Sequence, residues 1–327
     1  MNQQAEQMKQ EATQHSMPLR RIMIAVDDSN ASKQAVRFAS RMAPRNADVR
    51  IVCAAGQPRA WQAGGAYTAG DAWLRESLAA ARQELRQEAE NTLEQAVAAF
   101  DGQVASVSGH VLNLTGESGA VVHALSAAAS EWRADLLVVG ARHQGRVKRW
   151  VDGSVSAALA VSAPCPLLVV PAEYEACAAP RFTRMLLATD GSEASTQAIQ
   201  AAMRLVEPQL ALRAIYVVDR GSVTGGPVAA PGLEEALTGL GRRALAAAQT
   251  QLEPAGCICE TALVATGLMR DDIAHTVLRD AKEWDADLVV LGTHGRRGVA
   301  RWLLGSVAQR AVEVTHIPLL LVGPCEG

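Results

Sequence analysis

Two loops of the chain combine glycines, basic residues and a serine in an order that suits the binding of a phosphate group. The clearer loop begins at Gly292, reads G-T-H-G-R-R-G, and ends with the run Gly305-Ser306-Val307. Glycines in a loop let backbone N–H groups approach an anion without a Cβ in the way. The N–H groups at a helix start, with the positive end of the helix dipole, attract the same anions. Gly292, Gly295, Gly305 and Ser306 therefore predict a phosphate site.

Two of these residues have expected local roles. Gly292 follows the apolar run from Leu288 to Leu291 and is expected to allow a sharp turn where that strand ends. Ser306 is expected to be the N-cap of the next helix, because a serine side chain accepts a hydrogen bond from the N–H groups of the first turn. A dinucleotide fingerprint is excluded, since the glycines follow the fourth strand of their module instead of the first, and the sequence contains no P-loop.

The chain repeats itself, and the repeat defines two modules. The segment from Arg21 to Asp27 reads RIMIAVD and the segment from Arg184 to Asp190 reads RMLLATD, at an offset of 163 residues. Later in each half, ADLLVVG or ADLVVLG precedes a basic loop that leads to Gly-Ser-Val. We predict a disordered tail at 1–18, a first module at 19–171, a linker at 172–181 and a second module at 182–323.

Short runs rich in Val, Ile and Leu alternate with longer amphipathic or Ala-rich segments, which is the pattern of βαβ units. In the second module we predict strands at 185–189, 212–217, 260–264, 288–291 and 319–322. The predicted helices cover 194–205, 233–252, 270–283 and 306–313. Nearly continuous apolar strands indicate a parallel sheet with helices on both faces. Each module is therefore expected to be an α/β unit with a five-stranded parallel sheet, which binds ligands beyond the carboxyl ends of its strands.

Each module ends in an apolar strand, at 167–170 and 319–322, which would be an exposed sheet edge if it had no partner. An unpaired apolar edge strand is prone to pair with another chain. We expect the strands at 167–170 and 319–322 to pair with each other, which gives one compact particle with pseudo-two-fold symmetry. A further dimer of chains stays open.

Composition limits the classes of function. The 327 residues include 49% hydrophobic and 20% charged residues with a formal net charge of -3, which is typical of a soluble globular protein. A near-neutral balance argues against nucleic acid as the ligand, because affinity for phosphate backbones comes from clustered Lys and Arg. No apolar run approaches the ~20 residues that cross a bilayer, and the first residues lack the apolar core of a signal peptide. We expect a cytoplasmic protein without membrane insertion, whose six cysteines are reduced.

The spacing within the second loop is specific. A G-x-x-G run, nine further residues and G-[S/T] resemble the ATP-binding members of the universal stress protein family, and the resemblance covers both modules. It implies that each module has the adenine-nucleotide α-hydrolase-like variant of the Rossmann-like fold. It also implies that Asp190 and Val217 contact the adenosine part of ATP. The residues that would hold the ribose and phosphates are Gly292, Gly295, Gly305, Ser306 and Val307, with His294 inside the same motif.

The resemblance implies a function as well: an ATP-binding regulator of stress response and survival, which binds ATP with or without Mg²⁺ and contacts protein partners of unknown identity. Two alternatives stay open. One is a slow ATPase or phosphotransferase, although the sequence shows neither a positioned general base nor a set of metal ligands. The other is an interaction scaffold that binds no nucleotide.

The first module keeps the frame of this motif but changes its contents. Gly140 and Gly153 are separated by the same thirteen-residue step as Gly292 and Gly305. The retained residues are Asp27, Gly140, Gly153 and Ser154, and Ala54 stands where the second module has Val217. The altered positions are Arg142 for His294, His143 for Gly295, Arg146 for Gly298 and Asp152 for Leu304. A side chain at His143 and a carboxylate at Asp152 oppose phosphate binding, so we predict one ATP per chain, in the second module. Weak binding by the first module through its basic residues stays open.

Overall fold

The computed structural model of the chain describes residues 19–55, 72–114, 120–141, 155–174, 182–207, 209–220, 232–267, 271–295 and 304–323. The strands of the first module are β1 (Arg21–Val26), β2 (Asp48–Ala55), β3 (Ser106–Asn113), β4 (Leu136–Ala141) and β5 (Leu167–Pro171). Its helices are α2 (Asn30–Met42), α3 (Ala72–Ala98), α4 (Ala120–Glu131) and α5 (Val155–Ser162). The expected tail at 1–18, and 175–181 of the expected linker, lie outside the described residues, so the module boundaries stay predictions.

The second module repeats this order of elements. Its strands are β6 (Arg184–Ala188), β7 (Ala211–Val218), β8 (Cys259–Ala265), β9 (Leu288–Gly292) and β10 (Leu319–Val322). Its helices are α6 (Glu193–Met203), α8 (Leu233–Leu252), α9 (Ile273–Glu283) and α10 (Ser306–Val314), with a short 3-10 turn at Glu253–Ala255. Each predicted strand and helix is present. The bounds of α8 and β10 match the prediction, whereas α9 begins three residues later than expected because Asp272 caps it by accepting a hydrogen bond from His275 N at 2.8 Å.

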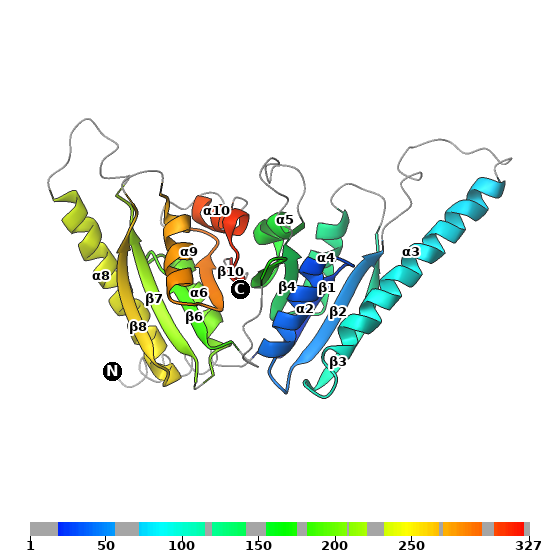
Figure 1. Cartoon of the computed structure of the whole chain (residues 1–327), viewed down its shortest axis with the longest axis horizontal. Coiled ribbons are helices and arrows are strands. Elements are labelled where there is room, and N and C mark those ends of the chain that lie inside the picture. The colour runs from blue at the N-terminus through cyan, green and yellow to red at the C-terminus, as the bar shows by residue number, and fades with distance from the viewer. Residues whose placement is uncertain are drawn as a thin grey trace.

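The described strands form one ten-stranded sheet in the order β3-β2-β1-β4-β5-β10-β9-β6-β7-β8. All pairs within a module are parallel, and the pair between modules is antiparallel, with Leu320 opposite Leu168. The predicted fold class is therefore confirmed, and so is the predicted pairing of the two terminal strands. Figure 1 shows the sheet twisting between its two ends, which carry the long helices α3 and α8.

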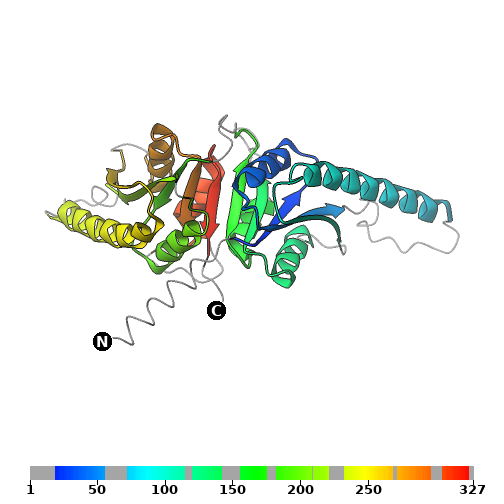
Figure 2. The ribbon, with the colours of Figure 1, turned by 90° about the horizontal axis from the view of Figure 1, so that it is seen from below.

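Helices cover both faces of the sheet (Figure 2). One core is built from the inward sides of α2, α3, α6 and α8, and the other from those of α4, α5, α9 and α10. Both cores contain residues of β5 and β10, so each continues across the module boundary. Strands that are buried on both faces explain why their sequences are continuously apolar and do not alternate with polar residues.

Further contacts join the modules. The ring of Phe182 stacks on that of Phe38 with centroids 6.2 Å apart, and Tyr174 meets Phe38 edge-on at 5.7 Å. At the end of α6, Arg204 donates a hydrogen bond of 2.7 Å from its guanidinium to Asp135, at the start of β4. The two modules are thus joined by a sheet, an aromatic cluster and an ion pair.

The repeat extends to the strand starts. Asp135 accepts hydrogen bonds from the backbone N–H groups of Arg20 and Arg21, and Asp287 accepts equivalent bonds from Thr183 and Arg184. These aspartates belong to the repeated A-D-L motif. They fix the start of the first strand of each module to the start of the fourth.

Cysteines and membrane segments can also be checked. The four described cysteines form no disulfide, and burial raises the pKa of the thiols of Cys53, Cys257 and Cys259. Cys177 and Cys325 lie outside the described residues. In the part of the chain that the structure describes, every helix is too short or too polar to cross a membrane.

Candidate functional site

The turn after β6 presents Asp190. Thr189 is held to β7 by a hydrogen bond from its N–H to the carbonyl of Ile215, at 2.9 Å. Gly191 adopts a φ of 75°, a left-handed conformation that glycine tolerates best. The Oδ1 atom of Asp190 accepts a hydrogen bond of 2.9 Å from Ser192 N, at the start of α6. The carboxylate is therefore fixed at the carboxyl end of the sheet, where ligands of parallel sheets bind.

Gly295 lies directly against this carboxylate. A Cβ atom at Gly295 would stand 3.1 Å from the Oδ2 atom of Asp190. Any larger residue would crowd the carboxylate or displace the loop. The structure thus brings together two predicted site residues that are separated by about a hundred positions in the sequence.

Gly305 closes the other end of the loop. Its N–H donates a hydrogen bond of 2.7 Å to the carbonyl of Thr293, and a Cβ at Gly305 would lie 2.9 Å from that same oxygen. Thr293 in turn donates from its N–H to the carbonyl of Val322 at 2.9 Å. The loop therefore leaves β9 and returns beside its starting point. Residues 296–303 within it lie outside the described residues.

The start of α10 corrects one expectation. The N-cap of this helix is Gly305, with φ of -60° and ψ of 145°, and Ser306 is the first helical residue instead of the cap. Among the described residues, no side chain caps the helix. The reason is the backbone bond from Gly305 to Thr293, which places the extended residue one position earlier than the preference of serine suggests. The first-turn N–H groups of α10 consequently have no side-chain cap and suit an anionic ligand.

Gly292 corrects a second expectation. It is the last residue of β9, pairs with Val322 in the sheet, and is absent from the residues with positive φ. A sharp turn is therefore not its role. A Cβ at Gly292 would lie 2.9 Å from the backbone carbon and oxygen of Ala194, so the missing side chain lets α6 pack closely on the strand.

His294 lies between Gly292 and Gly295 at the start of the loop. Its Nδ1 atom is 2.9 Å from the hydroxyl oxygen of Thr293, and its Nε2 atom is buried without a hydrogen-bond partner among the described residues. A buried polar atom without a partner costs free energy. If the Thr293 hydroxyl donates to Nδ1, the proton of the neutral ring is on Nε2, which is then a donor.

Val217 and Val307 complete the predicted set. Val217 is the penultimate residue of β7, half-buried, and opposite Val264 of β8. Val307 is half-buried in the first turn of α10, where it packs on the core of that face. The structure places both beside the strand ends that carry Asp190 and the loop, and it records no direct contact between them.

Charged groups hold α9 and α10 together near the site. Arg310 of α10 lies 3.6 Å from the carboxylate of Asp272, the N-cap of α9. Burial raises the pKa of Asp272, but hydrogen bonds from His275 and the charge of Arg310 outweigh it and lower the pKa overall. Within the described ranges, no three His, Cys, Asp or Glu side chains gather as a metal site.

The equivalent turn of the first module is built differently. The carboxylate of Asp27 accepts hydrogen bonds from the hydroxyl groups of Ser29 and Ser32, the latter at 2.6 Å, and from Ser29 N at 3.0 Å. Gly140 is packed more tightly than Gly292, since a Cβ there would lie 2.4 Å from the carbonyl carbon of Ala31. The altered loop residues of this module, 142–154, lie outside the described residues.

Sequence reasoning missed Thr189 and Thr293. Both are buried, and their hydroxyl groups bond to Ser195 and His294, respectively, behind the predicted ligand residues. The available signal was the internal repeat, because the first module has Val26 and Ala141 at these positions. A buried hydroxyl in place of a methyl group needs a hydrogen-bond partner. These two positions therefore mark places where the second module is built differently from the first.

Comparison with known proteins gives a consistent result. The Universal stress protein family matches twice, at residues 18–171 and 181–323. A universal stress protein of Methanocaldococcus jannaschii is 32% identical over 144 residues, which are 43% of this chain and 82% of the relative. One of Bacillus subtilis is 31% identical over 151 residues, 43% of this chain and 99% of the relative. The crystal structure of a universal stress protein from Archaeoglobus fulgidus is similar in fold, with a TM-score of 0.58 at 15% identity, over 93% of this chain and 98% of that one.

Proposed function

Because the chain belongs to the universal stress protein family, we propose that it binds one ATP, at the carboxyl ends of β6 and β9, and acts as a non-catalytic regulator of stress response and survival. The adenosine part lies against Asp190 and Val217. The phosphates lie against Gly295, Gly305, Ser306 and the start of α10, with His294 as an additional donor.

The observation that carries this proposal is the contact between Gly295 and Asp190. A carboxylate accepts hydrogen bonds from ribose hydroxyl groups, and a loop that contains glycines offers N–H groups to phosphates. The two occur at one edge of the sheet, since Gly295 leaves only 3.1 Å between its missing Cβ and the carboxylate. The uncapped start of α10 adds further donors and the positive end of a helix dipole.

Isothermal titration calorimetry of the full chain with ATP, with and without Mg²⁺, tests the proposal. We expect a stoichiometry near one per chain. Gly295→Val should weaken binding at least about tenfold, because losing one or more charge-assisted hydrogen bonds costs roughly 1.5–3 kcal/mol each. The matched change His143→Val in the first module should leave the affinity unchanged.

Other outcomes separate the alternatives. Two equivalent sites, or a larger effect of the change at His143, would show that the first module binds nucleotide. No heat and no nucleotide released from the denatured protein would favour the scaffold. Slow but reproducible turnover would favour the slow ATPase or phosphotransferase, and a rate near the ~10 s⁻¹ median of enzymes would mean that the site is an active site. Absent turnover supports a binding protein.

A further inference from the structure

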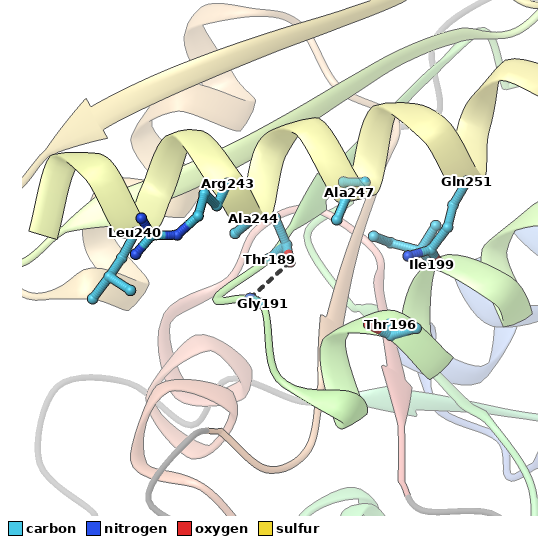
Figure 3. A pocket seen from close by; sticks show the side chains of 10 residues that line it. Thr189, Gly191, Thr196, Ile199, Leu240, Arg243, Ala244, Ala247 and Gln251 are labelled. Carbon is cyan, nitrogen blue, oxygen red and sulfur yellow. Dashed lines mark hydrogen bonds between the residues drawn. The ribbon is translucent and has the colours of Figure 1, made fainter.

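A second concave site lies on the other side of the turn that carries Asp190. It is a groove between α6 and α8 with a cavity volume of about 200 Å³, and it reaches the turn through Thr189 and Gly191. Figure 3 shows Thr189 and Gly191 beneath Ala244, with Gln251 farther along α8 and Ile199 of α6 below it. Asp190, Gly295 and Gly305 are not among the residues that line it. The groove is therefore separate from the proposed ATP site, although one turn borders both.

Five of the ten residues that line the groove have aliphatic side chains, and the others add polar surface. Alanines of α8 and the side chains of Ile199 and Leu240 line its length. An engineered cavity of about 150 Å³ with aliphatic walls binds benzene in another protein, so a groove of about 200 Å³ accommodates a ring with small substituents. The aliphatic part of the wall favours such a body over a compact inorganic anion.

One end of the groove carries a cation. Arg243 lines it, and no acidic side chain in the described part of the chain forms an ion pair with this guanidinium. Arginine binds carboxylates through two parallel hydrogen bonds. Leu240, Ala244 and Ala247, the neighbours of Arg243 in the lining, offer no side-chain donors to the additional oxygens of a phosphate, so a carboxylate fits this end better.

The other end carries an unpartnered acceptor. The Oε1 atom of Gln251 is buried and has no hydrogen-bond partner among the described residues. Gln251 and Arg243 lie about 12 Å apart along α8 at 1.5 Å per residue. A buried carbonyl oxygen of this kind calls for an N–H or O–H donor.

We propose that the groove between α6 and α8 binds a small carboxylate with a ring-sized apolar body and a hydroxyl group at its far end. The carboxylate pairs with Arg243, the ring lies on the alanines of α8, and the hydroxyl donates to Gln251. The occupant touches Thr189 and Gly191, whose hydrogen bond of 3.1 Å shapes the turn that presents Asp190. The inference concerns a ligand other than ATP and goes beyond the proposed function.

A titration of the full chain with 4-hydroxyphenylacetate, followed by nitrogen-15 NMR, tests this directly. We expect saturable shifts of the backbone N–H of Gly191 and of the residues of α8 that line the groove. Arg243→Gln should weaken binding about tenfold, the effect of a lost bidentate charge-assisted pair. Arg242→Gln, on the same helix but outside the groove, is the matched control and should not change the affinity.

Two further comparisons make the test specific. Phenylacetate, which lacks the hydroxyl, should bind about fivefold more weakly because it leaves Gln251 unpartnered. Ala247→Phe, at an exposed position that lines the groove, should block binding without unfolding the protein. Absence of saturable binding, or equal weakening by Arg242→Gln and Arg243→Gln, overturns the proposal.

Addition of ATP distinguishes the groove from the proposed nucleotide site. We expect 4-hydroxyphenylacetate to bind in the presence of saturating ATP, and displacement of this probe by ATP overturns the proposal of a separate site. Of these experiments, only the competition with ATP depends on the proposed function. If ATP does not bind at all, the proposed function fails, whereas the binding measured by NMR stands.

Discussion

The turns that follow the first strand of each module contain the same residue types and use them differently. Asp27 and Asp190 are each followed two residues later by a serine and five residues later by another. In the first module the hydroxyl of Ser32 donates to the carboxylate of Asp27. In the second module the hydroxyl of Ser195 donates to the carbonyl of Ser192 and contacts that of Thr189 at 3.1 Å.

The two turns differ at the residues on either side of the aspartate. Val26 of the first module is replaced by Thr189, whose hydroxyl attracts that of Ser195, and Asp28 is replaced by Gly191 at a φ of 75°. The first turn therefore uses its hydroxyls to satisfy its own aspartate, and the second directs one elsewhere. The hydroxyl groups around the two aspartates are thus arranged differently, although the aspartate and the two serines are the same.

The largest expected effect concerns helix packing on the fourth strand. Gly140→Ala should lower the free energy of unfolding by about 3 kcal/mol or more, because the new Cβ would meet the backbone of Ala31 at 2.4 Å. Gly292→Ala should cost about 1–2 kcal/mol, since its nearest backbone contact is 2.9 Å. Urea unfolding of the two variants measures the difference. Equal costs would show that α2 and α6 adjust equally well and that the two packings do not differ.

The next effect concerns the two aspartates. Asp190→Ala should weaken ATP binding about tenfold or more, because a carboxylate that accepts hydrogen bonds from a ligand contributes roughly 1.5–3 kcal/mol. Asp27→Ala should leave the affinity unchanged and should instead destabilise the first module, where two serine hydroxyls lose their acceptor. Calorimetry and thermal unfolding of both variants report the two effects. A silent change at Asp190 with loss of binding at Asp27 would assign the site to the first module.

A third effect tests whether the modules are energetically separate. Asp135→Asn should cost about 1–2 kcal/mol, since it weakens the ion pair with Arg204 across the boundary, where both side chains are about one quarter exposed. A double-mutant cycle with Arg204→Gln should give a coupling of about 1 kcal/mol. Zero coupling would mean that this contact does not join the modules.

The pair of Asp135 and Arg204 should also make the stability of the folded protein depend on pH. Burial raises the pKa of Asp135, but hydrogen bonds from Arg204, Arg21 and Arg20 outweigh it and hold the pKa below its ordinary value of 3.8. A carboxylate with a depressed folded pKa stabilises the protein above its unfolded pKa, and this stability is lost as the pH falls through the folded value. The difference in stability between the native protein and Asp135→Asn should therefore be constant near pH 7 and shrink below about pH 4.

The fold could be predicted from the sequence because its signals are local and repeated. Buried strands appear as apolar runs, and the bounds of β10 and α8 follow directly from such patterns. The start of α9 was misplaced because the cap formed by Asp272 depends on its backbone conformation, which a propensity does not give. Ser306 was misassigned as a cap for a related reason: the bond between Gly305 and Thr293 decides where the helix begins.

The site could be predicted only in part. The spacing of the loop predicted the glycines and the family resemblance predicted Asp190, and the structure brings Gly295 against that carboxylate. The spacing of the motif did not show that Gly292 allows α6 to pack on the strand. In a sequence, a glycine that a turn requires looks the same as a glycine that close packing requires. Thr189 was missed because its buried hydroxyl bonds to Ser195 and not to a predicted ligand residue.

The smallest effect tests this indirect role. Thr189→Val gives the second module the residue of the first and removes the hydroxyl that bonds to Ser195 and accepts from Gly191 N. Without that contact, the hydroxyl of Ser195 should exchange its bond to the carbonyl of Ser192 for one to Asp190, as Ser32 bonds to Asp27, and compete with the ligand. We expect ATP affinity to fall about threefold and stability by about 1 kcal/mol, the usual contribution of a neutral hydrogen bond. The reverse change, Val26→Thr, should leave ATP affinity unchanged. If Thr189→Val alters stability alone, the two aspartates differ for a reason that lies in the loop after the fourth strand, and Thr189 is only a packing residue.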